Sequence, residues 1–147
     1  MLLIKNATIL DAVHPEPYQA DILIEDGKIK QIAPDMQANG AEVFDATGLY
    51  AFPGFIDAHS HLGMDGWGIG YEGTDYNELN DQVTPHLRAI DGFKPLQPTL
   101  LEAARAGVTC VCTGPGSANV IGGTFIAVKT VGHRADDMIV KADVAMV

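Results

Sequence analysis

Residues 49–61 read LYAFPGFIDAHSH, an apolar run that stops at two histidines one residue apart. A run of this kind is typical of a strand buried on both faces in a parallel sheet or barrel. Alternate side chains of a strand share a face, so we expect the imidazoles of His59 and His61 on one side. Histidine is the commonest neutral nitrogen ligand for zinc and related metals. The pair therefore predicts a metal site at the strand end, with further ligands supplied from elsewhere.

The residues before this segment have a different pattern. Residues 1–50 show the short alternation of apolar and polar side chains that is typical of β-strands. Asp26 and Gly27 separate two such stretches, and this dipeptide tolerates the positive backbone angles of a tight hairpin turn. We therefore predict two domains: a small antiparallel β-sandwich layer over residues 1–50, and an α/β domain over residues 51–147.

A helix is predicted shortly after the long polar connection that follows His61. Residues 99–107 read TLLEAARAG, in which Thr99 is the expected N-cap and Glu102 completes a capping box. Gly107 is the expected end of the helix, because glycine adopts the left-handed conformation found there.

The β-branched residues 108–113 predict a strand directly after this helix. Strand, helix and strand in this order form the crossover unit of a parallel sheet. The glycine-rich residues 114–123 follow the second strand, and α/β folds bind ligands at the carboxyl ends of their strands. One more strand is expected over residues 124–130.

Composition and charge exclude several classes of partner. The chain has 147 residues, 47% of them hydrophobic, with a formal net charge of -10 and a pI near 4.6. Nucleic acids and anionic membranes bind basic surfaces, so neither is an expected partner. The sequence shows no membrane-spanning stretch or signal peptide, which favours a cytoplasmic location. Cys110 and Cys112 are expected as reduced, buried thiols, with a metal role as the alternative.

Several motifs together resemble a known family. The segments ILIEDGKIKQIAP and DATGLYAFPGFIDAHSHLG look like the amino-terminal part of the metal-dependent amidohydrolase superfamily. The later segments DYNELNDQVTPHLRAIDGF, EAARAGVTCVCTGPGSANVIGG and VKT resemble the imidazolonepropionase-like amidohydrolases more than the dihydroorotase or dihydropyrimidinase branches.

This resemblance implies a TIM-type β/α barrel with one or two divalent metals at its mouth, and a β-sandwich built from both chain ends. The implied reaction is hydrolysis of amide or cyclic carbon–nitrogen bonds in a small-molecule substrate. His59 and His61 match the family's first two metal ligands. The implied metal is zinc, with iron or another transition metal as alternatives, because imidazole suits several.

The family's other metal ligands and its water-activating aspartate have no counterpart in the chain, so the catalytic residues are expected beyond residue 147. A full barrel needs roughly 250 residues, and residues 51–147 account for its first two or three strands. We therefore expect an inactive amino-terminal fragment whose partner is the remainder of the barrel. A homo-oligomer is left open.

Four further residues are candidates for the site. Asp57 shares a strand face with His59 and is expected either to accept a hydrogen bond from an imidazole or to cap the barrel mouth. His86 and Arg88 lie in the long connection, where Arg88 is expected either to clamp a substrate carboxylate or to pair with neighbouring acids. Asn119 is a candidate hydrogen-bond donor to substrate.

The connection after His61 contains a tryptophan and an acid-rich stretch, and each has two alternative roles. Trp67 lies among glycines and is expected as a lid over the site or as a packing anchor. The acid-rich stretch from Asp65 to Asp81 is expected as solvated loop surface, with attraction of a cation as the alternative. His14 and His133 are interpreted as structural or exposed.

A different functional class is a non-catalytic relative that keeps the fold as a scaffold or interaction protein. The retained pair His59 and His61 argues against it, because a scaffold has no physical need for two adjacent imidazoles. Metal analysis separates the two hypotheses.

Overall fold

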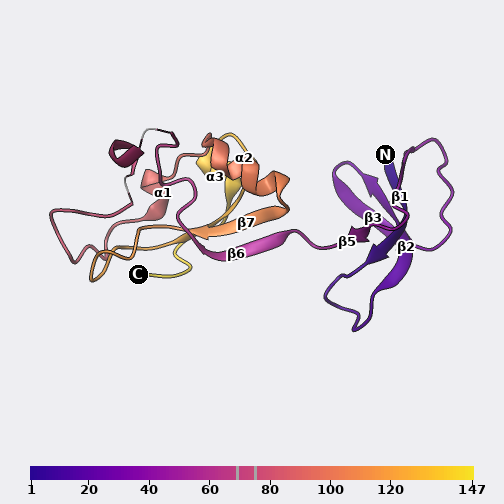
Figure 1. Ribbon diagram of the computed structural model, residues 1–147, viewed down its shortest axis with the longest axis horizontal. Coiled ribbons are helices and arrows are strands. Elements are labelled where there is room, and N and C mark those ends of the chain that lie inside the picture. The colour runs from indigo at the N-terminus through magenta and orange to yellow at the C-terminus, as the bar shows by residue number, and fades with distance from the viewer. Residues whose placement is uncertain (69, 75) are drawn as a thin grey trace. The chain divides into compact units, whose positions relative to one another are not determined.

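Figure 1 shows the computed structural model, which describes residues 1–68, 70–74 and 76–147. Its contacts divide the chain into two compact units, Met1–Pro53 and Gly54–Val147. Asp75, which belongs to the acid-rich stretch, lies outside the described residues. Among those residues, no helix has the length and apolar character needed to cross a membrane.

The first unit is a single sheet of five strands. They are β1 (Leu2–Ile9), β2 (Tyr18–Glu25), β3 (Lys28–Ala33), β4 (Glu42–Asp45) and β5 (Tyr50–Ala51). The predicted hairpin is confirmed: β2 and β3 pair antiparallel across Asp26 and Gly27, whose φ angles are 51° and 71°.

The antiparallel pairings of the predicted layer are present, and the sheet contains parallel pairings that the prediction did not include. The strand order is β3-β2-β1-β4, with β5 also beside β1, and both β4 and β5 run parallel to β1. Residues 34–41 carry the chain from the end of β3 back to the end of the sheet at which β1 begins, so β4 enters in the direction of β1. The sheet is therefore mixed.

A buried carboxylate anchors this sheet. Asp21 is 3% exposed, and its Oδ1 atom accepts the backbone N–H of Asn6 at 2.8 Å. Its Oδ2 atom accepts the backbone N–H of Met36 at 2.9 Å and lies 3.3 Å from the Lys5 ammonium. Burial raises the pKa of Asp21, but these hydrogen bonds and the Lys5 charge outweigh it and hold the pKa below its ordinary value.

The second unit contains a four-stranded sheet and short helices. Its elements are β6 (Phe55–Ser60), the 3-10 helix η1 (Gly70–Gly73), α1 (Ala89–Gly92), α2 (Pro98–Arg105), β7 (Val108–Thr113), β8 (Ile126–Lys129), α3 (Ala135–Met138) and β9 (Ile139–Lys141). The strand order is β6-β7-β8-β9. β6 and β7 pair in parallel, which confirms the predicted crossover unit.

β8 runs antiparallel to β7, because residues 114–125 reverse the chain without a crossover helix. Two parallel strands of the expected barrel are therefore present, and the described residues form no closed barrel. The fold is β-rich, with two small sheets and few helices. Assignment of residues 51–147 to a barrel domain stays a prediction.

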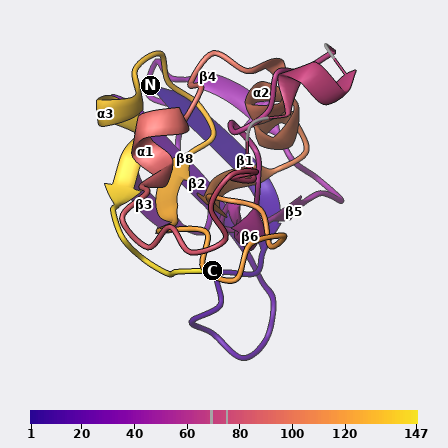
Figure 2. The same cartoon turned by 90° about the vertical axis from the view of Figure 1, so that its left-hand side faces the viewer.

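The core of the second unit lies between its sheet and its helices. The buried residues are Met64, Ala89, Phe93, Leu100, Val111, Ile126, Val128 and Met138. Figure 1 shows α2 alongside β7, and the view in Figure 2 shows α1 beside β8. This packing fixes the carboxyl ends of β6 and β7, where the two histidines and the glycine-rich loop lie.

Two local predictions for this unit are wrong. The apolar run near residue 50 is not one strand buried on both faces: residues 52–54 interrupt it, and Ile56 of β6, the edge strand of its sheet, is 72% exposed. The helix begins at Pro98, whose fixed φ suits the first helical position. Thr99 therefore lies inside α2 and does not form the predicted capping box with Glu102.

Candidate metal centre

The two histidines lie next to one another at the carboxyl end of β6. Their ring centroids are 5.4 Å apart, and the ring planes are nearly perpendicular at 88°. Both rings also contact the buried ring of Phe125, with centroid distances of 5.3 Å for His59 and 6.1 Å for His61. The imidazoles therefore share one side of the chain, as the spacing predicts, and Phe125 forms the platform beneath them.

A hydrogen bond fixes the tautomer of His61. Its Nδ1 atom lies 2.8 Å from the carbonyl oxygen of Gly114, which follows β7. A carbonyl oxygen accepts hydrogen bonds, so Nδ1 carries the hydrogen and Nε2 keeps its lone pair. The Tyr76 ring stacks on the imidazole at a centroid distance of 5.3 Å and an interplanar angle of 11°. These contacts orient the His61 ring so that the lone pair of Nε2 could bind a metal, an arrangement that is usual for metal-binding histidines.

The Asp57 carboxylate accepts a hydrogen bond from the backbone of His59, one of the two candidate metal ligands. Its Oδ1 atom accepts the backbone N–H of His59 at 3.1 Å. This bond holds the end of β6, while the carbonyl of Gly114 serves as the acceptor for the His61 ring. A role for Asp57 as acceptor of the His59 imidazole stays a prediction.

The spacing of the two ring centroids can be compared with that of two imidazoles on one metal ion. Two imidazoles on one ion, at a metal–nitrogen distance of about 2 Å and a near-tetrahedral angle, have centroids roughly 5 Å apart. The observed separation of 5.4 Å matches this spacing. No group of three or more His, Cys, Asp or Glu side chains suited to a metal occurs among the described residues. Binding of a metal by His59 and His61 stays a prediction.

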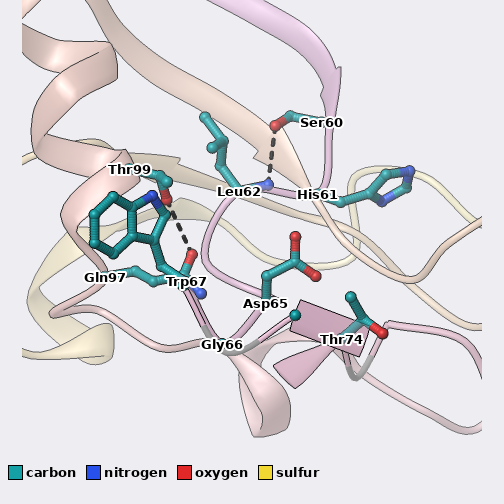
Figure 3. Close-up of a pocket in the computed structure, with 11 residues that line it drawn as sticks. Ser60, His61, Leu62, Asp65, Gly66, Trp67, Thr74, Gln97 and Thr99 are labelled. Carbon is teal, nitrogen blue, oxygen red and sulfur yellow. Dashed lines mark hydrogen bonds between the residues drawn. The ribbon is translucent and has the colours of Figure 1, made fainter. Parts of the chain in front are cut away.

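A cavity of ≈ 530 Å³ adjoins His61. It lies between the loop after β6 and the start of α2, and its lining includes Asp65, Trp67, Gln97 and Thr99. Figure 3 shows the Trp67 indole beside Gln97 and Thr99, with the Asp65 carboxylate between them and His61 in this view. Trp67 is 56% exposed, which fits the lid alternative better than the packing anchor.

The predicted substrate residues lie elsewhere in this unit. His86 and Arg88 line a second cavity of ≈ 280 Å³ together with Tyr76, the residue that stacks on His61. The Arg88 guanidinium forms two hydrogen bonds with Asp91, at 2.9 and 3.0 Å, and this pairing raises the pKa of Arg88. The ion-pair alternative is therefore the one present in the structure, and both partners are exposed.

Asn119 holds the glycine-rich loop in place. Its Nδ2 atom donates to the backbone carbonyls of Glu78 at 2.7 Å and Asp81 at 3.1 Å. Both amide hydrogens are therefore engaged, so in this structure the predicted donation to substrate has no hydrogen available. Substrate contact by Asn119 would have to use the carbonyl oxygen, which has no partner among the described residues.

The two cysteines are free thiols on β7. Cys110 is buried and Cys112 is half-buried, in agreement with the expectation of reduced core cysteines. Burial raises the pKa of Cys112, and the neighbouring Cys110 and Asp57 add to the effect. Neither thiol belongs to a metal-binding group among the described residues.

Sequence reasoning missed several residues that shape the site. Gly114, Phe125 and Tyr76 orient the imidazoles, and Gln97 lines the adjoining cavity. The position of Gly114 immediately after β7 was the available signal, because the ends of parallel neighbours meet at one edge of a sheet. The other contacts depend on the path of the long loop.

Curated relatives carry hydrolase names. The chain is 38% identical to the amidohydrolase tasK of Hapsidospora irregularis, over 79% of this chain and 12% of that protein. It is 56% identical to a D-hydantoinase of Geobacillus stearothermophilus over 42% of this chain and 13% of that protein. It is 36% identical to a dihydroorotase of Staphylococcus aureus over 78% of this chain and 22% of that protein. The chain thus spans less than a quarter of the length of each of these relatives.

A solved structure agrees with these relatives. The crystal structure of an amidohydrolase from Thermotoga maritima matches 99% of this chain and 38% of its own chain, with a TM-score of 0.87 and 40% identity. No family model matches the chain. Sequence and fold together place the chain in the metal-dependent amidohydrolase superfamily, where it corresponds to the amino-terminal portion. The imidazolonepropionase-like subgroup stays a prediction, since these relatives carry other names.

Proposed function

We propose that the protein is a metal-dependent hydrolase of carbon–nitrogen bonds in amides or cyclic amides, with His59 and His61 as two of its metal ligands. The observation that carries the proposal is the pair of adjacent rings at the end of β6, one of them with its Nδ1–H tied to Gly114. The hydrolase names of the relatives support the same reaction class.

In this proposal, Gly114 and Phe125 position the imidazoles of His59 and His61. The Gly114 carbonyl holds the His61 ring so that its Nε2 lone pair is available, and Phe125 supports both imidazoles from below. When bound, the ion would supply water activation near neutral pH and polarisation of a carbonyl oxygen. Zinc is the metal we favour, and iron or another transition metal suits imidazole as well.

The substrate in this proposal is a small molecule that reaches the ion from a neighbouring cavity. His86 and Arg88 remain candidates for its recognition, because both line the ≈ 280 Å³ cavity that Tyr76 borders. For Arg88 to bind a substrate carboxylate, its bonds to the exposed Asp91 would have to exchange. Exposed ion pairs are weak, so this exchange has a small cost.

Metal content and turnover test the proposal together. The full-length protein is expected to contain a stoichiometric divalent metal and to hydrolyse a member of a panel of amides and cyclic amides. Replacing His59 and His61 by alanine should abolish both properties, whereas His133→Ala, a histidine in a polar turn, should leave them unchanged. Absence of metal from the unaltered protein, or full activity in the double variant, would contradict the proposal and favour the scaffold alternative.

A further inference from the structure

Two residues that line the cavity beside His61 each have a buried polar atom without a partner among the described residues. These atoms are Nε2 of Gln97 and Oδ1 of Asp65. Both residues line the same ≈ 530 Å³ cavity, and Gln97 is 8% exposed. Leaving a buried donor or acceptor unpaired costs free energy, so such atoms are rare in folded proteins and call for an explanation.

The orientation of the Gln97 amide follows from its neighbours. Its Oε1 atom accepts the backbone N–H of Gly63 at 2.9 Å and the hydroxyl of Thr99 at 3.1 Å. A backbone N–H can only donate, so the oxygen must face Gly63. Nε2 is consequently the amide atom left to donate to something else, and its partner must be an acceptor such as a carbonyl oxygen.

Asp65 and Trp67 line the same cavity, where Oδ1 of Asp65 needs a hydrogen-bond donor. Figure 3 shows the indole of Trp67 beside Gln97 and Thr99, and the Asp65 carboxylate on the side toward His61. A carboxylate and an indole that line one cavity both attract cations. No lysine or arginine is among the described residues that line this cavity.

Lys94 is a cation of the chain that could compete for Asp65. It borders an adjacent cavity of ≈ 390 Å³ that also touches Asp65, Trp67 and Gln97. The ion pairs between described residues do not include one between Lys94 and Asp65. The Asp65 carboxylate is therefore open to a cation that comes from outside the chain.

From these contacts we infer that the cavity binds a protonated amine that carries a neighbouring carbonyl group, as in an α-amino amide. The ammonium lies against Asp65 and Trp67, and the carbonyl oxygen accepts from Nε2 of Gln97. The inference names a substrate class for the proposed hydrolase and rests on that function for the reaction. Binding itself needs the cavity residues and not the metal.

Calorimetric titration of the full-length protein with three probes tests the inference. Phenylalaninamide has both groups, 2-phenylethylammonium lacks the carbonyl, and N-acetylphenylalaninamide lacks the charge. Phenylalaninamide is expected to bind more tightly than either of the others. The titrations are repeated after chelation of metal, so that coordination of the free amine to the ion is not mistaken for binding in the cavity.

Three variants assign the contacts. Asp65→Asn should weaken binding of phenylalaninamide by about tenfold or more, since it removes the charge that pairs with the ammonium. Trp67→Leu should weaken it by about threefold. Gln97→Glu keeps the acceptor for Gly63 and Thr99 but removes the donor, so the preference for phenylalaninamide over 2-phenylethylammonium should disappear. Glu72→Gln is the control for Asp65→Asn, because it removes the same charge from the same loop at a residue that does not line the cavity.

The outcomes separate this inference from the proposed function. Equal binding of the acetylated probe, equal effects of Asp65→Asn and Glu72→Gln, or no binding of any probe would overturn the inference and leave water as the occupant of the cavity. Selective binding that persists after chelation in a protein without hydrolase activity would sustain the inference and contradict the proposed function.

Discussion

At the scale of single residues, the site depends on the close approach of Gly114 to Phe125. Gly114 is buried, its carbonyl holds His61, and a Cβ atom at this position would lie 2.5 Å from Cδ2 of Phe125. Phe125 in turn contacts both imidazoles. A side chain at residue 114 would therefore disturb the platform and the tautomer-fixing bond together.

We accordingly expect Gly114→Ala to weaken metal binding by about 10- to 100-fold, the usual effect of disturbing groups that orient metal ligands. Overpacking against Phe125 should also lower the free energy of unfolding by about 1–3 kcal/mol. Competition with a chelator measures the affinity, and thermal unfolding of the metal-free protein measures the stability.

Gly92→Ala is the matched control for Gly114→Ala. A Cβ there would meet the flexible end of Met64 at 3.3 Å, so small effects on stability and metal affinity are expected. If Gly114→Ala bound metal as tightly as the unaltered protein, the orienting role of the Gly114 carbonyl would be refuted.

At the scale of elements, β1 and β2 are joined by more than their ladder of backbone hydrogen bonds. Asn6 interrupts the regular pairing at a bulge with φ of 62°, and its N–H turns to the buried Asp21 on β2. The same carboxylate reaches Met36 in the loop after β3 and the ammonium of Lys5. One side chain therefore ties together two strands and a loop.

Asp21→Asn should lower the free energy of unfolding of the first unit by about 2–4 kcal/mol, because an amide nitrogen would face a backbone N–H and the Lys5 charge would lose its partner. Asp35→Asn, an exposed carboxylate in a nearby turn, is the control and should change little. Denaturant unfolding monitored by circular dichroism gives both values.

The pH dependence follows from the lowered pKa of Asp21. Its folded pKa lies below the ordinary 3.8, so the unfolded chain takes up the proton more readily than the folded one. The stabilising contribution is present above about pH 4 and is lost as the pH falls through the folded pKa. Asp21→Asn should lack this part of the acid destabilisation, and an unaltered acid profile in the variant would contradict the assignment.

At the scale of the whole molecule, local signals in the sequence predicted the local structure well. The turn at Asp26 and Gly27, the helix end at Gly107 and the crossover into β7 follow from backbone preferences and short-range patterns. The shared side of His59 and His61 follows from strand geometry. These features need no knowledge of distant residues.

The features that the sequence did not predict depend on distant contacts. The Gly114 carbonyl lies 53 residues from His61, and the parallel pairing of β4 with β1 depends on the path of the connection after β3. The exposure of β6 reflects its place at the sheet edge, which an apolar pattern does not encode. The burial of the unpaired atoms of Gln97 and Asp65 likewise depends on how the long loop folds.

X-ray absorption spectroscopy of the zinc-loaded, full-length protein tests most directly whether His59 and His61 bind one metal ion. We expect a nitrogen shell at about 2.0–2.1 Å with imidazole scattering beyond it. The imidazole count should fall by one in His59→Ala and by one in His61→Ala, and should be unchanged in His133→Ala. A spectrum in which neither single variant alters the imidazole count would show that His59 and His61 are not ligands of the zinc ion.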